Sequence, residues 1–272
     1  MRLFDRFPLR YAVPNAVTCT SVVFGLASIR QSLTATDASQ FQRAAWFILY
    51  AVLLDKVDGA VARKLHASSE FGVQLDSFSD FVTFGLAPAA LITSLIPWAM
   101  PQPWAHGGHQ SLVLAVGAAY AVAAALRLAK FNITTATNDP RFFRGLPSTS
   151  SGGLLASTFL AHQELGLDVS LLPAMAVFMA LNAVLMVSNL PQPKLAISRS
   201  RPVMAFQVLI IASVYTFIPL HRFPTYLAAL ASIYTFFGFV YGVIETRGGG
   251  SGSAGDEDDE EDDEALAHGH VR

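Results

Sequence analysis

Long apolar segments separated by short polar ones run along most of the chain, and they constrain its fold more than any other feature. They cover approximately residues 14–33, 43–64, 72–97, 111–133, 153–165, 168–190, 202–220 and 223–245. About 20 apolar residues are enough for a helix to cross a bilayer, and backbone groups in lipid must be hydrogen-bonded within their own segment. We therefore predict an all-α, polytopic integral membrane helical bundle with about eight transmembrane helices. The short run at 153–165 is expected to be tilted or partly buried.

Charged residues are scarce and unevenly placed, with nine of the 20 acids in one C-terminal run. They make up only 14% of the 272 residues, against about 25% in a soluble domain. Residues 247–272 contain Gly and Ser and then nine consecutive acids, so we predict a disordered acidic tail. Residues 1–13 mix arginines with apolar side chains and are predicted to be a cytoplasmic juxtamembrane segment; a signal peptide is the alternative. The transmembrane domain is expected to span 14–246.

The distribution of Lys and Arg predicts the orientation of the bundle. With eight spans, the loops and helix ends on one side hold 13 basic residues, whereas the other side holds three, Arg30, Arg43 and Arg222. Basic residues are retained on the cytoplasmic side of membrane proteins. The first side, which includes the turn at 64–71, is therefore predicted to face the cytoplasm from a bacterial or archaeal cytoplasmic membrane.

Four carboxylates lie close together in this apolar chain. Asp55 and Asp58 are three residues apart, and Asp76 and Asp80 are four apart, so each pair shares one helix face. The polar turn at 64–71 makes the two helices antiparallel, and Asp55 and Asp80 then lie roughly 12–13 Å from that turn at 1.5 Å per residue. Ionised carboxylates at such a depth are costly and mark a function. Oxygen ligands suit a hard divalent cation such as Mg²⁺ or Mn²⁺.

These aspartates belong to a longer motif, D-x2-D-G-x2-A-R-x8-G-x3-D-x3-D. All its fixed positions are matched, by Asp55, Asp58, Gly59, Ala62, Arg63, Gly72, Asp76 and Asp80. The motif resembles the signature of the CDP-alcohol phosphatidyltransferases, and the likeness extends from residue 14 to about residue 245. It implies a six-helix core, attack of an alcohol on the lipid-side phosphorus of a CDP-lipid such as CDP-diacylglycerol, and release of CMP. It also implies a homodimer. The alternative is a buried ion-pair cluster without chemistry.

The resemblance also implies roles for individual residues. Two divalent metal ions would be held by the four aspartates, and Asp80 would also be the general base on the acceptor hydroxyl. The CDP-lipid would be bound by a set that includes two glycines, which permit close approach: Asn15, Thr18, Asp58, Gly59, Ala62, Arg63 and Gly72. Tight helix packing is a second explanation for the glycines.

The first membrane helix is expected to begin at Pro14, because proline favours a helix start. Asn15 and Thr18 follow it and lie one turn apart. Two roles are open for this pair, namely capping the helix and bordering the nucleotide pocket.

A second pair of motifs points to the acceptor. The runs R-L-A-K-F-N at 127–132 and F-R-G-L-P at 143–147 resemble those of the branch of the family that uses serine, the phosphatidylserine synthases. Two positions depart from that pattern, Lys130 in place of Arg and Thr149 in place of Pro. The resemblance implies L-serine as the acceptor, and the candidates for binding it are Arg127, Lys130, Asn132 and Arg144. An arginine fork suits a carboxylate; positive-inside anchoring is the alternative for the basic residues.

Other functions fit parts of the pattern. Within the same chemistry, the acceptor could be glycerol 3-phosphate or an inositol phosphate, and the donor could be a CDP-archaeol. In a different class, the carboxylates could form the site of a membrane cation transporter. A transporter is expected to show repeated halves with broken helices, whereas the aspartate motif occurs once.

Overall fold

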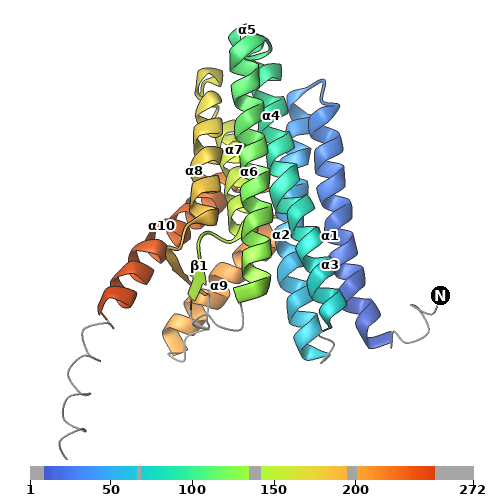
Figure 1. Ribbon diagram of the computed structural model, residues 1–272, viewed down its shortest axis with the longest axis vertical. Coiled ribbons are helices and arrows are strands. Elements are labelled where there is room, and N and C mark those ends of the chain that lie inside the picture. Colours follow the sequence, from blue (N-terminus) through green and yellow to red (C-terminus); the bar gives the residue numbers. More distant parts are fainter. Residues whose placement is uncertain (1–8, 66–68, 135–141, 195–200, 249–272) are drawn as a thin grey trace, which may run out of the picture.

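The structure, a computed structural model, describes residues 9–65, 69–134, 142–194 and 201–248. Long helices run side by side in an upright bundle, and a short two-stranded ribbon lies near its lower end (Figure 1). The prediction of an all-α helical bundle is confirmed. The predicted acidic tail and most of the predicted juxtamembrane segment lie outside the described residues.

The helices have the following bounds. In chain order they are α1 (Leu9–Leu33), α2 (Ala38–Lys64), α3 (Glu70–Asp80), the π-helix η1 (Phe81–Leu86), α4 (Ala87–Ala99), α5 (Pro101–Trp104), α6 (Gly107–Thr134), α7 (Ser148–Glu164), the 3-10 helix η2 (Val169–Leu171), α8 (Pro173–Val187), α9 (Arg201–Phe217) and α10 (Pro224–Gly248). The strands are β1 (Phe142–Arg144) and β2 (Pro191–Pro193), which pair antiparallel. Because α3, η1 and α4 follow one another without a break, they form one rod.

Each predicted apolar segment corresponds to one long helical rod in the described residues, namely α1, α2, α3–η1–α4, α6, α7, α8, α9 and α10. Five helices are long and apolar enough to cross a membrane: residues 12–33, 70–99, 107–134, 169–187 and 224–246. Helix α9 is apolar but shorter, and α2 has 27 residues but carries the charged motif in its second half. This pattern is typical of an integral membrane protein.

The predicted start of the first helix was wrong. Helix α1 already includes Leu9, and Pro14 lies inside it. Pro14 is buried near the start of the helix, and the apolar residues Ala12 and Val13 extend the helix upstream. Backbone groups that enter lipid must be paired within the helix, and this requirement outweighs the preference of proline for the first position. Capping is therefore excluded for the residues that follow Pro14.

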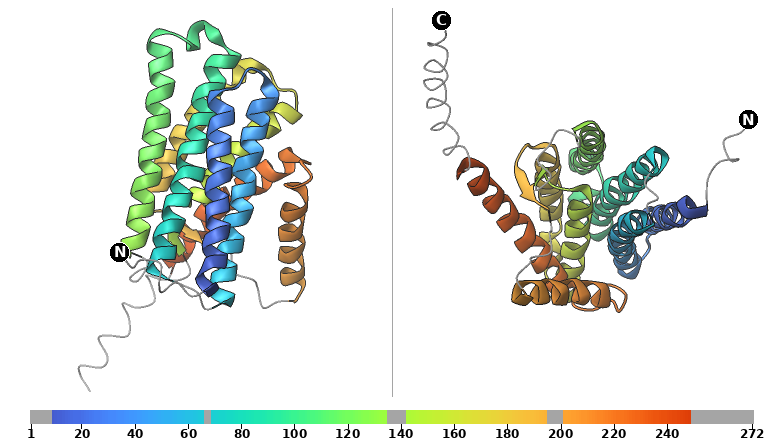
Figure 2. Two further views of the ribbon diagram at one scale, coloured as in Figure 1. Left: turned by 90° about the vertical axis from the view of Figure 1, so that its right-hand side faces the viewer. Right: turned by 90° about the horizontal axis from the view of Figure 1, so that it is seen from below.

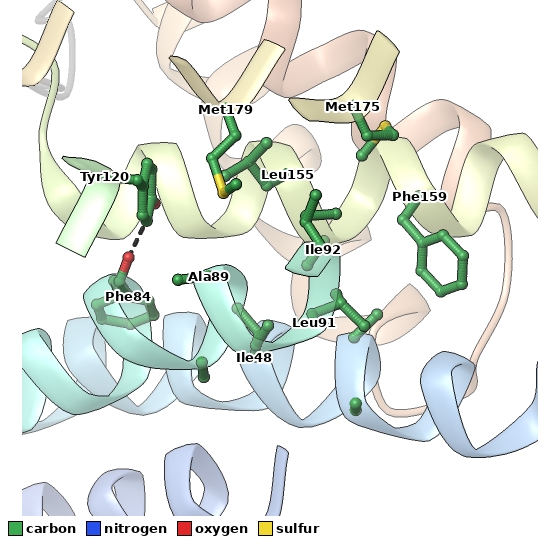
Figure 3. Packing of buried hydrophobic residues seen from close by; sticks show 14 of the residues in the cluster. Ile48, Phe84, Ala89, Leu91, Ile92, Tyr120, Leu155, Phe159, Met175 and Met179 are labelled. Atoms are coloured by element: carbon green, nitrogen blue, oxygen red, sulfur yellow. Dashed lines mark hydrogen bonds between the residues drawn. The ribbon is translucent and has the colours of Figure 1, made fainter. Parts of the chain in front are cut away.

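Helix α7 lies at the centre of the bundle, and this position explains its short apolar run. It packs against α2, α4, α6, α8 and α10, and most of its side chains are buried. Figure 3 shows the side chains that fill the space around it, among them Leu155 and Phe159 of α7, Ile48 of α2 and Met179 of α8. Figure 2, seen from below, shows α10 on the side of the bundle away from α1, with α9 along the adjoining edge. A helix enclosed by others needs no lipid-facing stripe.

Candidate active site and metal centre

A cavity of about 650 Å³ lies where α2 ends and α3 begins. Its walls come from α1, α2, α3, α6, α7 and α10, and from the segments that carry the two strands. The polar and charged side chains on these walls are Asn15, Thr18, Asp55, Lys56, Asp58, Ser69, Asp76, Ser77, Asp80, Arg127, Asn132, Thr149, Ser150, Lys194 and Tyr234. All four aspartates of the motif are among them, so segments far apart in the sequence meet at one site.

Three of the four carboxylates converge. Asp55, Asp76 and Asp80 each offer an oxygen, and these oxygens lie within 4.8 Å of one another. Asp80 is buried, and the other two are half-buried. The only cation that forms an ion pair with them in the described residues is Lys56, whose Nζ lies 3.0 Å from Asp55 Oδ2. Negative charge therefore exceeds positive charge at the cluster.

Asp58 lies apart from this group and is held by α1. The Thr18 hydroxyl lies 3.0 Å from Asp58 Oδ2 and 3.1 Å from the carbonyl oxygen of Pro14, so it can donate to either acceptor. The backbone N–H of Gly59 donates to Asp58 Oδ1 over 2.6 Å. Both Thr18 and Asp58 are buried. The contact fixes the orientation of Asp58 toward the cavity wall that α1 provides.

The donor set fits a hard divalent cation. Converging carboxylate oxygens without a thiolate or imidazole suit Mg²⁺ or Mn²⁺ rather than a softer metal. A bound cation would relieve the uncompensated charge of the cluster, because like charges a few ångströms apart repel strongly in a low-dielectric surrounding. We therefore expect Asp55, Asp76 and Asp80 to share a metal site, with Asp58 beside it.

Asp80 takes part in a second chain of contacts that reaches α6. The Ser148 hydroxyl donates to Asp80 Oδ2 over 3.2 Å, and Arg127 Nη1 donates to Ser148 Oγ over 3.1 Å. Arg127 is only 8% exposed, and its Nε has no hydrogen-bond partner among the described residues. Its guanidinium also lies 5.7 Å from the centre of the Phe131 ring. Arg127 thus places a buried guanidinium beside the cavity, and the natural hydrogen-bond partners of such a group are anions.

The structure separates the four candidates for binding serine. Arg127 and Asn132 line the cavity, and Asn132 Nδ2 donates to Ser77 Oγ over 2.9 Å. Lys130 is not among the lining residues; its Nζ donates to Asn189 Oδ1. Arg144 lies exposed on β1 and is also absent from the lining. The described geometry therefore brings two of the four to the site.

Most of the candidates for binding the CDP-lipid also line the cavity. They are Asn15, Thr18, Asp58, Gly59 and Gly72. A Cβ added at Gly72 would lie 3.2 Å from Ser69 Oγ and 3.5 Å from Asn15 Oδ1, so a side chain there would crowd this wall. The side chains of Ala62 and Arg63 lie outside the described part of the structure.

Sequence reasoning missed several residues of the cavity wall, among them Phe143, Lys194 and Tyr234. The β1–β2 pairing brings Lys194 to within 5.1 Å of the Phe143 ring centre. The Tyr234 hydroxyl of α10 donates to the carbonyl oxygen of Pro193 over 2.9 Å. In the sequence analysis Lys194 was only one of the 13 basic residues assigned to the cytoplasmic side. No local pattern links it to Phe143, because about 50 residues separate the two.

Comparison with known proteins identifies relatives of the chain. The family model described as CDP-alcohol phosphatidyltransferase matches residues 11–188. A CDP-diacylglycerol–serine O-phosphatidyltransferase of Helicobacter pylori is 32% identical over 184 residues, which cover 67% of this chain and 72% of the relative. The protein of the same name from Bacillus subtilis is 35% identical over 140 residues, covering 52% of this chain and 71% of the relative. One from Saccharomyces cerevisiae is 34% identical over 121 residues, covering 42% and 40%.

Proposed function

Because the chain belongs to the CDP-alcohol phosphatidyltransferase family, we propose that it transfers the phosphatidyl group of CDP-diacylglycerol to L-serine, giving phosphatidylserine and CMP. The matched relatives carry the name of this activity. The observation that carries the proposal is the convergence of the Asp55–Asp76–Asp80 cluster with buried Arg127 in one cavity. This arrangement offers a site for a phosphoryl transfer next to a site for an anionic group of the acceptor.

Asp80 is the proposed general base. In the reaction the serine hydroxyl oxygen bonds to the lipid-side phosphorus, the bond from that phosphorus to the bridging oxygen breaks, and CMP leaves with the electron pair. The proton of the hydroxyl passes to a carboxylate oxygen of Asp80. The hydroxyl of Ser148 holds Oδ2 of Asp80, which leaves the other carboxylate oxygen for the incoming proton. A base must lie within hydrogen-bond reach of the proton it accepts.

The metal ions in this proposal are two Mg²⁺ or Mn²⁺ ions, bound by Asp55, Asp58, Asp76 and Asp80. When bound, such ions neutralise the charge of the diphosphate and stabilise the leaving group. The contribution of the protein itself is to fix the orientation of the carboxylates. Thr18 and the N–H of Gly59 orient Asp58, and Lys56 pairs with Asp55.

Recognition of serine is assigned to Arg127 and Asn132. The guanidinium group of Arg127 lines the cavity and can bind the serine carboxylate, and the Phe131 ring supports the guanidinium. Asn132 lines the same cavity, and its side-chain oxygen can accept from the serine ammonium group. Lys130 and Arg144 are not assigned to serine, because neither lines the cavity.

Several further features belong to the same proposal. The CDP-lipid is bound along α1 and the facing ends of α2 and α3, by Asn15, Thr18, Gly59 and Gly72, with Ala62 and Arg63 of the motif. The cavity opens to the cytoplasm, in agreement with the basic residues counted on that side. The protein acts as a homodimer in the cytoplasmic membrane, and its transmembrane catalytic domain spans about residues 14–246.

The test is CMP release by the purified full-length protein in detergent, with CDP-diacylglycerol, Mn²⁺ or Mg²⁺, and one acceptor at a time. We expect release that depends on L-serine, with phosphatidylserine as the product, and loss of release in EDTA. Asp80→Asn is the matched inactive control. Release only with glycerol 3-phosphate or an inositol phosphate would overturn the serine assignment, and release only from a CDP-archaeol would overturn the donor. Cation flux in liposomes without CMP release would favour a transporter.

A further inference from the structure

A π-helical turn begins directly after Asp80. Residues 81–86 form η1, and the N–H of Ala87 donates to the carbonyl of Val82, five residues back instead of four. Such turns are rare inside α-helices and occur frequently at functional sites. The turn adds one residue between α3, which carries the carboxylates, and α4, which packs in the core. It therefore sets the rotation of Asp80 about the helix axis relative to α4.

Pro88 explains why the regular helix gives way here. In an α-helix the carbonyl of Phe84 accepts the N–H of the residue four positions later, which is Pro88. Proline has no N–H, and its ring clashes with that carbonyl. The carbonyl of Phe84 therefore needs another donor, since an unpaired backbone oxygen is costly when buried, and Phe84 is fully buried.

Tyr120 of α6 provides that donor. Its hydroxyl lies 2.8 Å from the carbonyl oxygen of Phe84, as the dashed line in Figure 3 shows. Because a carbonyl oxygen only accepts, Tyr120 gives its single proton to Phe84. The side chain of Tyr120 is completely buried in the described structure, so no water competes for this bond. The contact ties η1 to α6 at the level of the turn.

The Tyr120 hydroxyl is itself fixed by two neighbouring helices. Ser151 Oγ of α7 lies 3.0 Å from the Tyr120 oxygen and 3.0 Å from Asn182 Oδ1 of α8. Asn182 Nδ2 donates to the carbonyl of Phe178 over 2.8 Å. Ser151 and Asn182 are both buried. Four rods thus meet in one buried polar cluster. The single hydroxyl proton of Ser151 can be donated to the Tyr120 oxygen or to Asn182 Oδ1, one at a time, and this contact adds to the packing that holds Tyr120 in place.

We propose that Tyr120, held by Ser151 and Asn182, is a positioning residue that fixes the η1 turn and thereby the orientation of Asp80. The inference rests on the proposed role of Asp80 as general base. Tyr120 does not line the cavity, so it acts through the turn and not on a substrate. The geometry predicts that removing one oxygen atom from α6 changes the rate of the chemical step without changing substrate binding.

The first test is Tyr120→Phe, which keeps the ring and removes the hydroxyl. We expect kcat for CMP release to fall about tenfold to a hundredfold, because a misplacement of about 1 Å at a reacting group costs this much. The KM for CDP-diacylglycerol should stay within twofold of the wild type. The matched control is Tyr226→Phe, whose lost hydroxyl contacts Ser213 between α9 and α10. A kcat of Tyr120→Phe equal to that of Tyr226→Phe would overturn the inference.

A second test measures thermal stability and does not depend on enzymatic activity. In a Pro88→Ala background the alanine N–H can donate to the Phe84 carbonyl, so Tyr120→Phe should lower Tm less than it does in the wild-type background. Equal losses in both backgrounds would show that Tyr120 does not serve this carbonyl, and would overturn the inference. If the wild-type protein released no CMP while this coupling was observed, the proposed function would fail and the Tyr120–Phe84 link would stand.

Discussion

Gly145, in the turn between β1 and α7, offers a quantitative test of the structure. Its φ is +77°, a backbone conformation that residues other than glycine rarely adopt. Its N–H donates to the carbonyl of Leu190 over 2.8 Å. A Cβ added there would lie 2.6 Å from the carbonyl oxygen of Met186 and 2.8 Å from that of Ser188. These oxygens belong to the backbone around the end of α8 and cannot turn aside as a side chain could.

The expected cost of Gly145→Ala has two parts. The left-handed conformation costs an L-residue about 1–2 kcal/mol, and forcing a methyl group into an occupied space costs about 1–3 kcal/mol more. The sum is about 2–5 kcal/mol in the free energy of unfolding. Gly145 is three residues before Ser148, which contacts Asp80, so we also expect kcat for CMP release to fall.

A substitution at Gly166, after the end of α7, separates the conformational part of this cost from the steric part. Its φ is +58°, but nothing lies within 4 Å of an added Cβ. Gly166→Ala should therefore cost only the conformational part, about 1–2 kcal/mol. The assay is thermal unfolding of both variants and the wild type in the same detergent, together with CMP release. If Gly145→Ala were no less stable than Gly166→Ala, the close approach of the turn to α8 would be refuted.

Three further predictions concern the cavity. Asp80→Asn should abolish CMP release while CDP-diacylglycerol binding, measured by calorimetry, stays within a few-fold of wild type; normal turnover would remove Asp80 from the role of base. Arg127→Lys should raise the KM for serine at least tenfold because lysine lacks the planar guanidinium fork that suits a carboxylate, whereas Lys130→Ala should leave it unchanged; the opposite order in serine titrations would reverse the assignment. Thr18→Val should weaken Mn²⁺ binding because Asp58 loses its hydroxyl contact, and Thr18→Ser should retain it; equal Mn²⁺ affinities in the two variants would contradict the role of the hydroxyl.

The sequence alone predicted the helical segments and the membrane class. A span needs about 20 apolar residues whatever surrounds it, so the apolar runs could be matched to α1 through α10 with end errors of a few residues. The start of α1 was among the largest of these errors, because proline at position 14 was given more weight than the apolar residues before it.

The aspartate pairs could also be found from the sequence, because the spacing within each pair determines that its two members share a face of one helix. Residues three or four apart share a helix face wherever the helix lies, and this rule groups Asp55 with Asp58 and Asp76 with Asp80. The rule does not say which of the four converge. In the structure Asp58 turns to Thr18 of α1, while the other three meet.

The tertiary structure alone decided the rest of the site. Which basic residues reach the cavity depends on how α6 is rotated: Arg127 faces inward to Ser148, whereas Lys130 turns to Asn189. Lys194 arrives only through the pairing of two three-residue strands. Apolar length and helical periodicity act along the chain and can be read from it, but helix rotation and loop pairing are determined by contacts between residues that are distant in sequence. The wall of the cavity is made of such contacts.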